Sequence, residues 1–179
     1  MSEMTIRRAN IDDASNIAKL ITETALIAFR NSGPPEALAR WLKANANILM
    51  ITNRIMNPQA MVFIAENQQE LLATGYLEER GEPDALYGYI GGVYCRRPRV
   101  GLGTRLVTQL AREADQRGYQ RLEMTIGQEN IPMQCLAKRL GFAPGAPHPD
   151  LAGFFLSEFA EWSVRTTFVL QDSLINNKN

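Results

Sequence analysis

The chain is poor in the residues that bind metals or form disulfides. Its 179 residues include two cysteines and one histidine, so we expect neither a disulfide framework nor a Cys/His zinc cluster. The single histidine, His148, lies in the proline-rich stretch Ala-Pro-His-Pro-Asp, where a solvated side chain is expected. This argues against a Ser-His-Asp hydrolase. We therefore expect no metal and no catalytic histidine.

The sequence also lacks an excess of charge and a long hydrophobic run. Lysine plus arginine and aspartate plus glutamate number 19 each, so no overall field attracts nucleic acid or an anionic membrane. No apolar run approaches the roughly 20 residues that a membrane-spanning helix needs, and the first residues contain no signal-peptide core. These absences predict a soluble, cytoplasmic protein with no nucleic-acid and no membrane partner.

The residues that are present can form one core. At 45% hydrophobic content, 179 residues have the size of one domain, and no repeat, linker or low-complexity segment divides them. We expect a single domain over residues 1–179, with a polar tail at 171–179.

The hydrophobic pattern changes between strand and helix periods along the chain. The expected elements are a strand at Thr5–Ala9, a helix that begins at Asp12 and extends to Ala28, a helical region at Glu36–Met56, strands at Met61–Ala65, Leu71–Glu79 and Leu86–Tyr94, a helix at Thr104–Arg117, a strand at Tyr119–Ile126, a helix from Asn130, and two strands within Phe154–Leu170. Short turns make the three strands between 61 and 94 antiparallel, whereas the crossover helix at 104–117 makes the strands on either side of it parallel. The sequence therefore predicts an α/β fold.

The most informative stretch joins the strand Leu86–Tyr94 to the helix Thr104–Arg117. It ends in Gly101-Leu-Gly103, where the missing Cβ atoms let a ligand approach the backbone. The unpaired N–H groups in the first turn of the helix, and the positive end of its dipole, favour a phosphate or pyrophosphate there. The arginines that reinforce this positive potential are Arg96, Arg97, Arg99 and Arg105.

Other phosphate-binding motifs fit this loop less well. A dinucleotide fingerprint needs a third glycine where Leu106 stands, and a P-loop needs Gly-Lys-Ser/Thr, which the chain lacks. A tight turn with solvated arginines is the alternative without a ligand.

A second stretch, Asn130–Phe142, is a short helix with clear ends. Asn130 is the expected N-cap, Pro132 lies in the first turn, and Gly141 ends the helix. This stretch and the glycine loop together resemble the GNAT superfamily of acyl-CoA-dependent N-acetyltransferases. The family's first motif is Arg/Gln-x-x-Gly-x-Gly/Ala after a strand that ends in Val, and its second runs from Asn through a short helix to Leu-Gly-Phe. The residues at the family's spacings are Val93, Gly101, Gly103, Asn130 and Leu140-Gly141-Phe142.

This resemblance implies a fold and an activity. The fold is a mixed, mostly antiparallel sheet of six to seven strands flanked by helices, with a splayed parallel central pair that holds the pantetheine arm. The activity is transfer of an acetyl group from acetyl-CoA, as co-substrate, to a primary amine by direct attack in a ternary complex. The acceptor is a small-molecule or peptide amine, and the last strands allow a homodimer. The cofactor-binding residues carried over are Val93, Tyr94, Cys95, Arg99, Val100, Gly101, Leu102, Gly103, Thr104 and Asn130.

Three residues depart from the family pattern. Pro98 occupies the Arg/Gln position and has no N–H, and Met133 replaces a small residue. Ala137 stands where many members have a tyrosine that protonates the departing CoA thiolate. Tyr94, Cys135 or an ordered water are the alternatives for this acid.

The general base does not follow from the motifs. The two positions where family members often carry a carboxylate are occupied by Tyr87 and Thr125. Glu123 shares a strand face with Thr125 and is our first candidate, and Glu79, which ends the preceding hairpin, is the second. Tyr87 and Tyr89 share a strand face and are candidates to line the acceptor pocket. Salt-bridged glutamates and half-buried sheet tyrosines are the structural alternatives.

Two other functions remain open. A CoA-binding sensor of the same fold, without turnover, is favoured by Ala137 and by the missing carboxylates. A nucleic-acid or anionic-partner module would use the four arginines of the loop, but it lacks interleaved aromatic residues beyond Tyr94.

Overall fold

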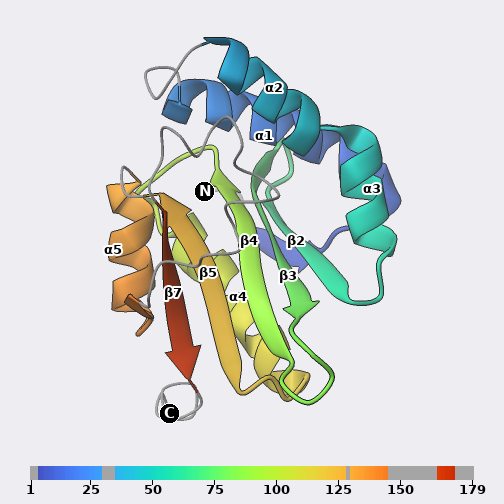
Figure 1. Cartoon of the computed structure of the whole chain (residues 1–179). Coiled ribbons are helices and arrows are strands. Elements are labelled where there is room, and N and C mark those ends of the chain that lie inside the picture. Colours follow the sequence, from blue (N-terminus) through green and yellow to red (C-terminus); the bar gives the residue numbers. More distant parts are fainter. Residues whose placement is uncertain (1–3, 30–34, 128–129, 145–164, 172–179) are drawn as a thin grey trace.

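The computed structural model describes residues 4–29, 35–127, 130–144 and 165–171, which form a sheet with helices on both faces (Figure 1). The elements are β1 (Thr5–Arg8), a 3-10 turn (Ile11–Asp13), α1 (Ala14–Phe29), α2 (Pro35–Asn45), α3 (Ile48–Met56), β2 (Ala60–Glu66), β3 (Leu71–Arg80), β4 (Tyr87–Cys95), α4 (Leu102–Gln116), β5 (Arg121–Gly127), α5 (Ile131–Arg139), β6 (Ala143–Pro144) and β7 (Arg165–Gln171).

The strands form one sheet in the order β1-β2-β3-β4-β5-β7-β6. Every neighbouring pair is antiparallel except β4 and β5, which α4 connects as a crossover. The predicted α/β class and the mixed, mostly antiparallel sheet with one parallel pair are therefore confirmed. Of the two strands expected within Phe154–Leu170, β7 is described, whereas residues 154–164 and 172–179 lie outside the described part.

The helical region predicted at Glu36–Met56 is two helices in the structure. The second helix, α3, starts after Asn47. The side-chain oxygen of Asn47 accepts hydrogen bonds from the N–H groups of Leu49, at 2.8 Å, and Met50, at 3.4 Å. An asparagine N-cap of this kind starts a new helix and satisfies its first unpaired donors. The segment Asn45–Asn47 is therefore the boundary between α2 and α3.

The alternating side chains of β2 explain why helices cover both faces of the sheet. Val62 and Ile64 pack with α1 and α3 on one face of the sheet, which we call the α1–α3 face. Met61, Phe63 and Ala65 pack with α4 on the opposite face, the α4 face. A strand buried on both faces is apolar at successive positions, as β2 is from Ala60 to Ala65. α4 presents buried residues at the helical period of 3.6 to this core, namely Leu102, Leu106, Val107, Leu110 and Ala114.

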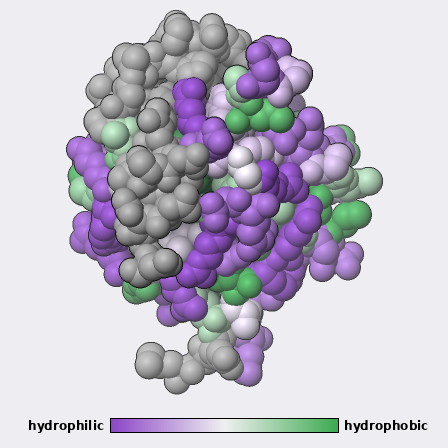
Figure 2. Space-filling view, turned by 90° about the horizontal axis from the view of Figure 1, so that it is seen from below, coloured by the Kyte–Doolittle hydropathy of each residue, from purple (hydrophilic) through white to green (hydrophobic). Residues whose placement is uncertain are grey.

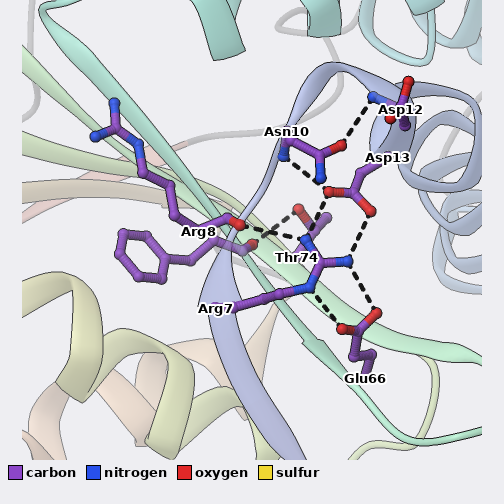
Figure 3. A network of polar contacts seen from close by, with 8 residues as sticks. Arg7, Arg8, Asn10, Asp12, Asp13, Glu66 and Thr74 are labelled. Carbon is purple, nitrogen blue, oxygen red and sulfur yellow. Dashed lines mark hydrogen bonds and ion pairs between the residues drawn. The ribbon is translucent and has the colours of Figure 1, made fainter.

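A charged network joins the start of the chain to the sheet (Figure 3). The guanidinium of Arg7, on β1, donates to both carboxylate oxygens of Asp13, at 2.8 and 2.9 Å, and to Glu66 on β2, at 2.6 and 3.1 Å. Asp13 also accepts a hydrogen bond from the N–H of Asn10, at 2.8 Å, and so completes a capping box ahead of α1. This network sets the position of α1 over the sheet.

The described surface seen from below is mostly hydrophilic, and its apolar residues form separate patches (Figure 2). Within the described ranges, no helix has both the length and the apolar character needed to cross a membrane.

We predict that Asp13→Asn lowers the free energy of unfolding at pH 7 by about 2 kcal/mol, because charge-assisted hydrogen bonds from Arg7 are lost. The hydrogen bonds from Arg7 hold the pKa of Asp13 below its ordinary value of 3.8. A carboxylate with a lowered pKa stabilises the fold above that ordinary value and loses this effect as the pH falls through its folded-state pKa. Urea unfolding at pH 7 and pH 3 measures this. A difference between the two proteins that stays constant with pH would contradict the assignment.

Candidate active site

Strand β4 contains a β-bulge in its carboxyl half. Thr74 lies opposite Tyr94 and Tyr76 lies opposite Gly91, so three steps along β4 match two steps along β3. Gly92 absorbs the extra residue with a φ of +57°, in the left-handed region that favours glycine.

The bulge changes which side chains share a face. Before it, Tyr89 lies near Tyr76 on the α1–α3 face, with ring centroids 6.5 Å apart, while Ile90 packs into the α4 core. After it, Tyr94 lies on the α1–α3 face and Val93 and Cys95 lie on the α4 face. Simple alternation from Tyr89 would have placed Val93, not Tyr94, beside Tyr76.

The ring of Tyr76 lies directly on the bulge. A Cβ atom added at Gly91 would come within 2.5 Å of the ring, and one at Gly92 within 2.7 Å. Burial raises the pKa of Tyr76 to about 12, so the phenol stays protonated. Only glycine lets the β4 backbone pass beneath this ring.

The parallel pair of β4 and β5 is splayed, as predicted. Its ladder has two pairs, Gly88 with Leu122 and Tyr89 with Glu123, and then no further pair forms between the two strands. We call the carboxyl halves, Ile90–Cys95 and Met124–Gly127, the splay, and Tyr89 with Glu123 its vertex. The backbone groups of β4 on the β5 side of the splay are thus left for a partner other than β5.

The N-terminus of α4 lies at the open end of the splay. Gly101, with a φ of +82°, precedes the helix, and no side chain caps it. The first hydrogen bond of the helix runs from the N–H of Arg105 to the carbonyl of Gly101, at 3.0 Å, so the N–H groups before it have no acceptor within the helix. A Cβ at Gly103 would lie 3.0 Å from Leu136 and 3.6 Å from the sulfur of Cys95, so α4 begins between α5 and the end of β4.

The structure divides the four arginines of the loop into two pairs. Arg96 forms ion pairs with Glu23, at 2.6 Å, and Glu70, at 3.3 Å, and Arg97 pairs with Glu70, at 3.2 Å. Arg99 and Arg105 are exposed and form no ion pair with a described residue. Two arginines, rather than four, are therefore left to contact a phosphate.

Glu123 lies at the vertex on the α1–α3 face. It is only 2% exposed, and the guanidinium of Arg121 donates a hydrogen bond to its Oε1. Two residues along, the hydroxyl of Thr125 is buried and has no hydrogen-bond partner in the described structure. Burial, followed by the charge of Glu123, raises the pKa of Tyr87. A carboxylate and an unpaired hydroxyl therefore lie together where the strands separate.

Glu79 lies away from this group. Its carboxylate accepts hydrogen bonds from the phenol of Tyr119, at 2.7 Å, and from Gln59, at 3.4 Å. Glu79 pairs with Gly88, whose α-carbon faces Leu122 in the α4 core, so Glu79 and Glu123 lie on opposite faces of the sheet. The structure does not bring the two candidate bases together.

The second motif forms the expected helix α5. Asn130 caps it by accepting a hydrogen bond from the N–H of Met133, at 3.3 Å. Ala137 is 0% exposed in the core, so its position has no room for a tyrosine acid, and Cys135 is exposed. Near the splay, burial raises the pKa of the Cys95 thiol to about 11, and it stays protonated at neutral pH.

Two features of this site were missed from the sequence. The adjacent glycines Gly91 and Gly92, inside a strand pattern, are a bulge signal that we did not use. Tyr76 and Arg54 come from β3 and α3, and their proximity to the bulge depends on tertiary packing. Tyr94 lies edge-on to Trp41 of α2, with ring centroids 6.3 Å apart.

Residues 21–142 match the family model of the acetyltransferase (GNAT) family. The chain belongs to the GNAT family. Its splay and α4 N-terminus are thus those of an acetyltransferase domain. A search of curated proteins gives no match.

Solved GNAT structures share the fold. PaiA N-acetyltransferase from Thermoplasma acidophilum, in complex with coenzyme A, has a TM-score of 0.79 at 11% identity and covers 94% of this chain and 99% of its own. An N-acetyltransferase from Staphylococcus aureus Mu50 has a TM-score of 0.73 at 15% identity, over 98% and 100% of the two chains. YncA from Salmonella typhimurium, with its cofactor acetyl-CoA, has a TM-score of 0.63 at 22% identity, over 94% of each.

The residues of this GNAT domain fit coenzyme A. The N–H groups at the start of α4, together with Arg99 and Arg105, suit the pyrophosphate, and the unpaired backbone of the splay suits an extended pantetheine arm. In the described part of the chain, no cluster of three or more His, Cys, Asp or Glu residues can hold a metal ion.

We predict that Gly92→Ala lowers the free energy of unfolding by about 3 kcal/mol, because the methyl group meets the Tyr76 ring and the residue is held at a positive φ. Gly118→Ala is the matched control, since Gly118 has a φ of +76° but nothing within 4 Å of the added Cβ. Backbone strain alone should cost this variant about 1 kcal/mol. Urea unfolding measures both, and equal losses would show that the Tyr76 ring does not restrict the bulge.

Proposed function

We propose that this GNAT protein transfers the acetyl group of acetyl-CoA to a primary amine by direct attack in a ternary complex. The observation that carries the proposal is the splay, which has a buried carboxylate at its vertex and an uncapped helix N-terminus at its open end. The two ends are joined by β4 backbone that has no β5 partner. Donor and acceptor held in this way gain much of their rate from proximity.

The acetyl donor, acetyl-CoA, is bound by residues of the glycine loop and of the Asn130–Phe142 stretch. The first turn of α4 and the loop before it bind the pyrophosphate through backbone N–H groups, and Asn130 lies beside the arm at the start of α5. Acetyl-CoA supplies an activated acetyl thioester. The backbone of the bulge polarises its carbonyl by hydrogen bonding. The proposed contacts are Val93, Tyr94, Cys95, Arg99, Val100, Gly101, Leu102, Gly103, Thr104 and Asn130.

The acceptor amine is bound on the α1–α3 face. An amine must be uncharged to attack a thioester, so a carboxylate that removes its proton is needed there. Glu123 is the proposed base, directly or through one ordered water, with the hydroxyl of Thr125 orienting the amine. Tyr87 and Tyr89 line this side of β4. Glu79 lies on the other face of the sheet and accepts a hydrogen bond from Tyr119, so it is not the proposed base.

The departing thiolate does not need a strong acid. A thiol has an ordinary pKa of about 8.5, so its thiolate is a fair leaving group. Tyr94 is the proposed proton donor, since Ala137 is enclosed in the core and Cys135 is exposed on α5. Without a tyrosine on α5, a slow thiol release is expected.

A CoA-binding sensor is the second candidate function. It is favoured by the enclosed Ala137 and by the ion pair between Glu123 and Arg121, which occupies one oxygen of the proposed base. Calorimetric titration with acetyl-CoA, followed by thiol-release assays on a panel of amines, separates the two functions. Binding with turnover supports the enzyme, and binding without turnover on any amine supports the sensor.

We predict that Gly103→Asp abolishes acetyl-CoA binding, because the added anion faces the pyrophosphate; such like-charge contacts reduce affinity by about 100-fold or more. Gly103→Ala is the control, since its Cβ makes the same contact with Leu136 without adding charge. Calorimetry measures both affinities, and thermal unfolding verifies the fold. Unchanged affinity in Gly103→Asp would remove the pyrophosphate site from the start of α4.

We predict that Glu123→Gln lowers kcat by about 10²- to 10⁴-fold, the contribution of a positioned base, with acetyl-CoA affinity unchanged. Glu79→Gln is the matched control on the opposite face and should leave kcat near that of the unmodified protein. Steady-state thiol release measures both variants. A loss of kcat in Glu79→Gln but not in Glu123→Gln would reverse the assignment of the base.

A further inference from the structure

Of the arginines that lie near the vertex of the splay on the α1–α3 face, Arg80 and Arg121 have carboxylate partners and Arg54 has none among the described residues. Arg80 donates to Glu78, at 2.8 and 3.2 Å, and Arg121 donates to Glu123. Arg54, on α3, forms no hydrogen bond or ion pair through its side chain to a described residue. These three arginines and two glutamates have a net charge of +1, because Arg54 has no carboxylate partner among the described residues.

Arg54 is held close to the bulge by an aromatic ring. The central carbon of its guanidinium lies 4.0 Å from the centroid of the Tyr76 ring, in a cation–π contact, and that ring lies on Gly91 and Gly92. The side chain of Arg54 is half-buried, so it is partly removed from water. Its N–H donors form a planar fork that matches a carboxylate in two parallel hydrogen bonds.

We propose that the acceptor is a primary amine that also carries a carboxylate, and that Arg54 binds this carboxylate. The proposal rests on the proposed function, because it places the amine at the vertex of the splay. A single unpaired arginine matches a monoanion, whereas a phosphate monoester would leave a negative charge without a partner. A diamine or polyamine would instead bring a second cation toward Arg54.

The spacing of the sheet sets the separation of the two acceptor groups. Arg54 lies over Tyr76 of β3 and Glu123 lies on β5, two strand spacings away, on the order of 10 Å. Tyr76 pairs with Gly91 and Glu123 with Tyr89, which adds an offset of about 7 Å along the strands and makes the separation about 12 Å. The ion pair with Arg54 takes up to about 4 Å of this distance, and the hydrogen bond from the amine to Glu123 takes about 3 Å. About 5 Å remain between the carboxylate and the amine. This is the span of an ω-amino acid such as 4-aminobutyrate or 5-aminovalerate, and it exceeds that of an α-amino acid.

Steady-state kinetics on four acceptors test the proposal: glycine, 4-aminobutyrate, 4-aminobutyramide and 1,4-diaminobutane. We expect kcat/KM for 4-aminobutyrate to exceed that for its amide by at least about 10-fold, the worth of a charge-assisted pair, and glycine and the diamine to be poorer still. Arg54→Met should remove this preference by raising KM for the acid alone, and Arg54→Lys should retain part of it. Equal efficiency for acid and amide, or a faster reaction with the diamine, would overturn the proposal.

Arg112→Met is the matched control, because Arg112 is an exposed arginine of α4, away from the α1–α3 face. It should leave the preference for the acid intact. Acetyl-CoA affinity should be unchanged in every variant, which verifies the fold. A loss in Arg54→Met that is equal for acid and amide would show a structural role only and would contradict carboxylate binding.

A binding experiment separates this proposal from the proposed function. If no amine releases thiol, acetyl transfer fails, but the carboxylate site is still tested by titrating the CoA-loaded protein with N-acetyl-4-aminobutyrate. Binding that is at least about 10-fold weaker in Arg54→Met supports the site. No binding, or equal affinity in the two proteins, overturns it.

Discussion

The organisation of this molecule depends on the close contact between the Tyr76 ring and the backbone of Gly91 and Gly92. No side chain fits beneath the ring, so two adjacent glycines are required, and one of them takes a positive φ. The resulting bulge adds a residue to β4 and increases its local twist, which accompanies the separation of β4 from β5. The splay, and the direction in which Tyr94 points, both depend on this contact.

Charge pairing distinguishes structural from functional arginines in this chain. Arg7 and Arg96 contact carboxylates of other elements and so connect parts of the fold, whereas Arg80 and Arg121 each pair with a glutamate of their own strand. Burial alone would lower the pKa of Arg80, but the hydrogen bond to Glu78 and nearby negative groups raise the pKa overall, so the guanidinium stays charged. Arg54, Arg99 and Arg105 form no ion pair with a described residue and lie near the two ends of the splay. These three positions are the ones at which we propose that ligand anions bind.

Much of the fold follows from local patterns. The crossover from β4 through α4 to β5 was predictable, because the apolar positions of α4 repeat at the helical period and a crossover joins parallel strands. The cap at Asn130 was also visible, since asparagine has a strong positional preference at helix starts. α4 begins at Leu102, after Gly101, and so starts two residues before the predicted Thr104. The division of Glu36–Met56 into two helices was not predicted, because the choice depends on whether the Asn47 side chain folds back onto the backbone.

The sequence by itself determined the α/β class, the glycine loop at the start of α4 and the short helix after Asn130, because helix periods and caps are properties of neighbouring residues. Only the tertiary structure decided which candidates meet. Glu123 and Glu79 are equivalent as sequence letters, yet one lies buried at the vertex and the other is bonded to Tyr119 on the opposite face. Arg54 is far from the motifs in sequence, and only the packing of α3 over β2 brings its side chain to the Tyr76 ring at the bulge. The physical reason is that burial and charge pairing depend on contacts between distant residues.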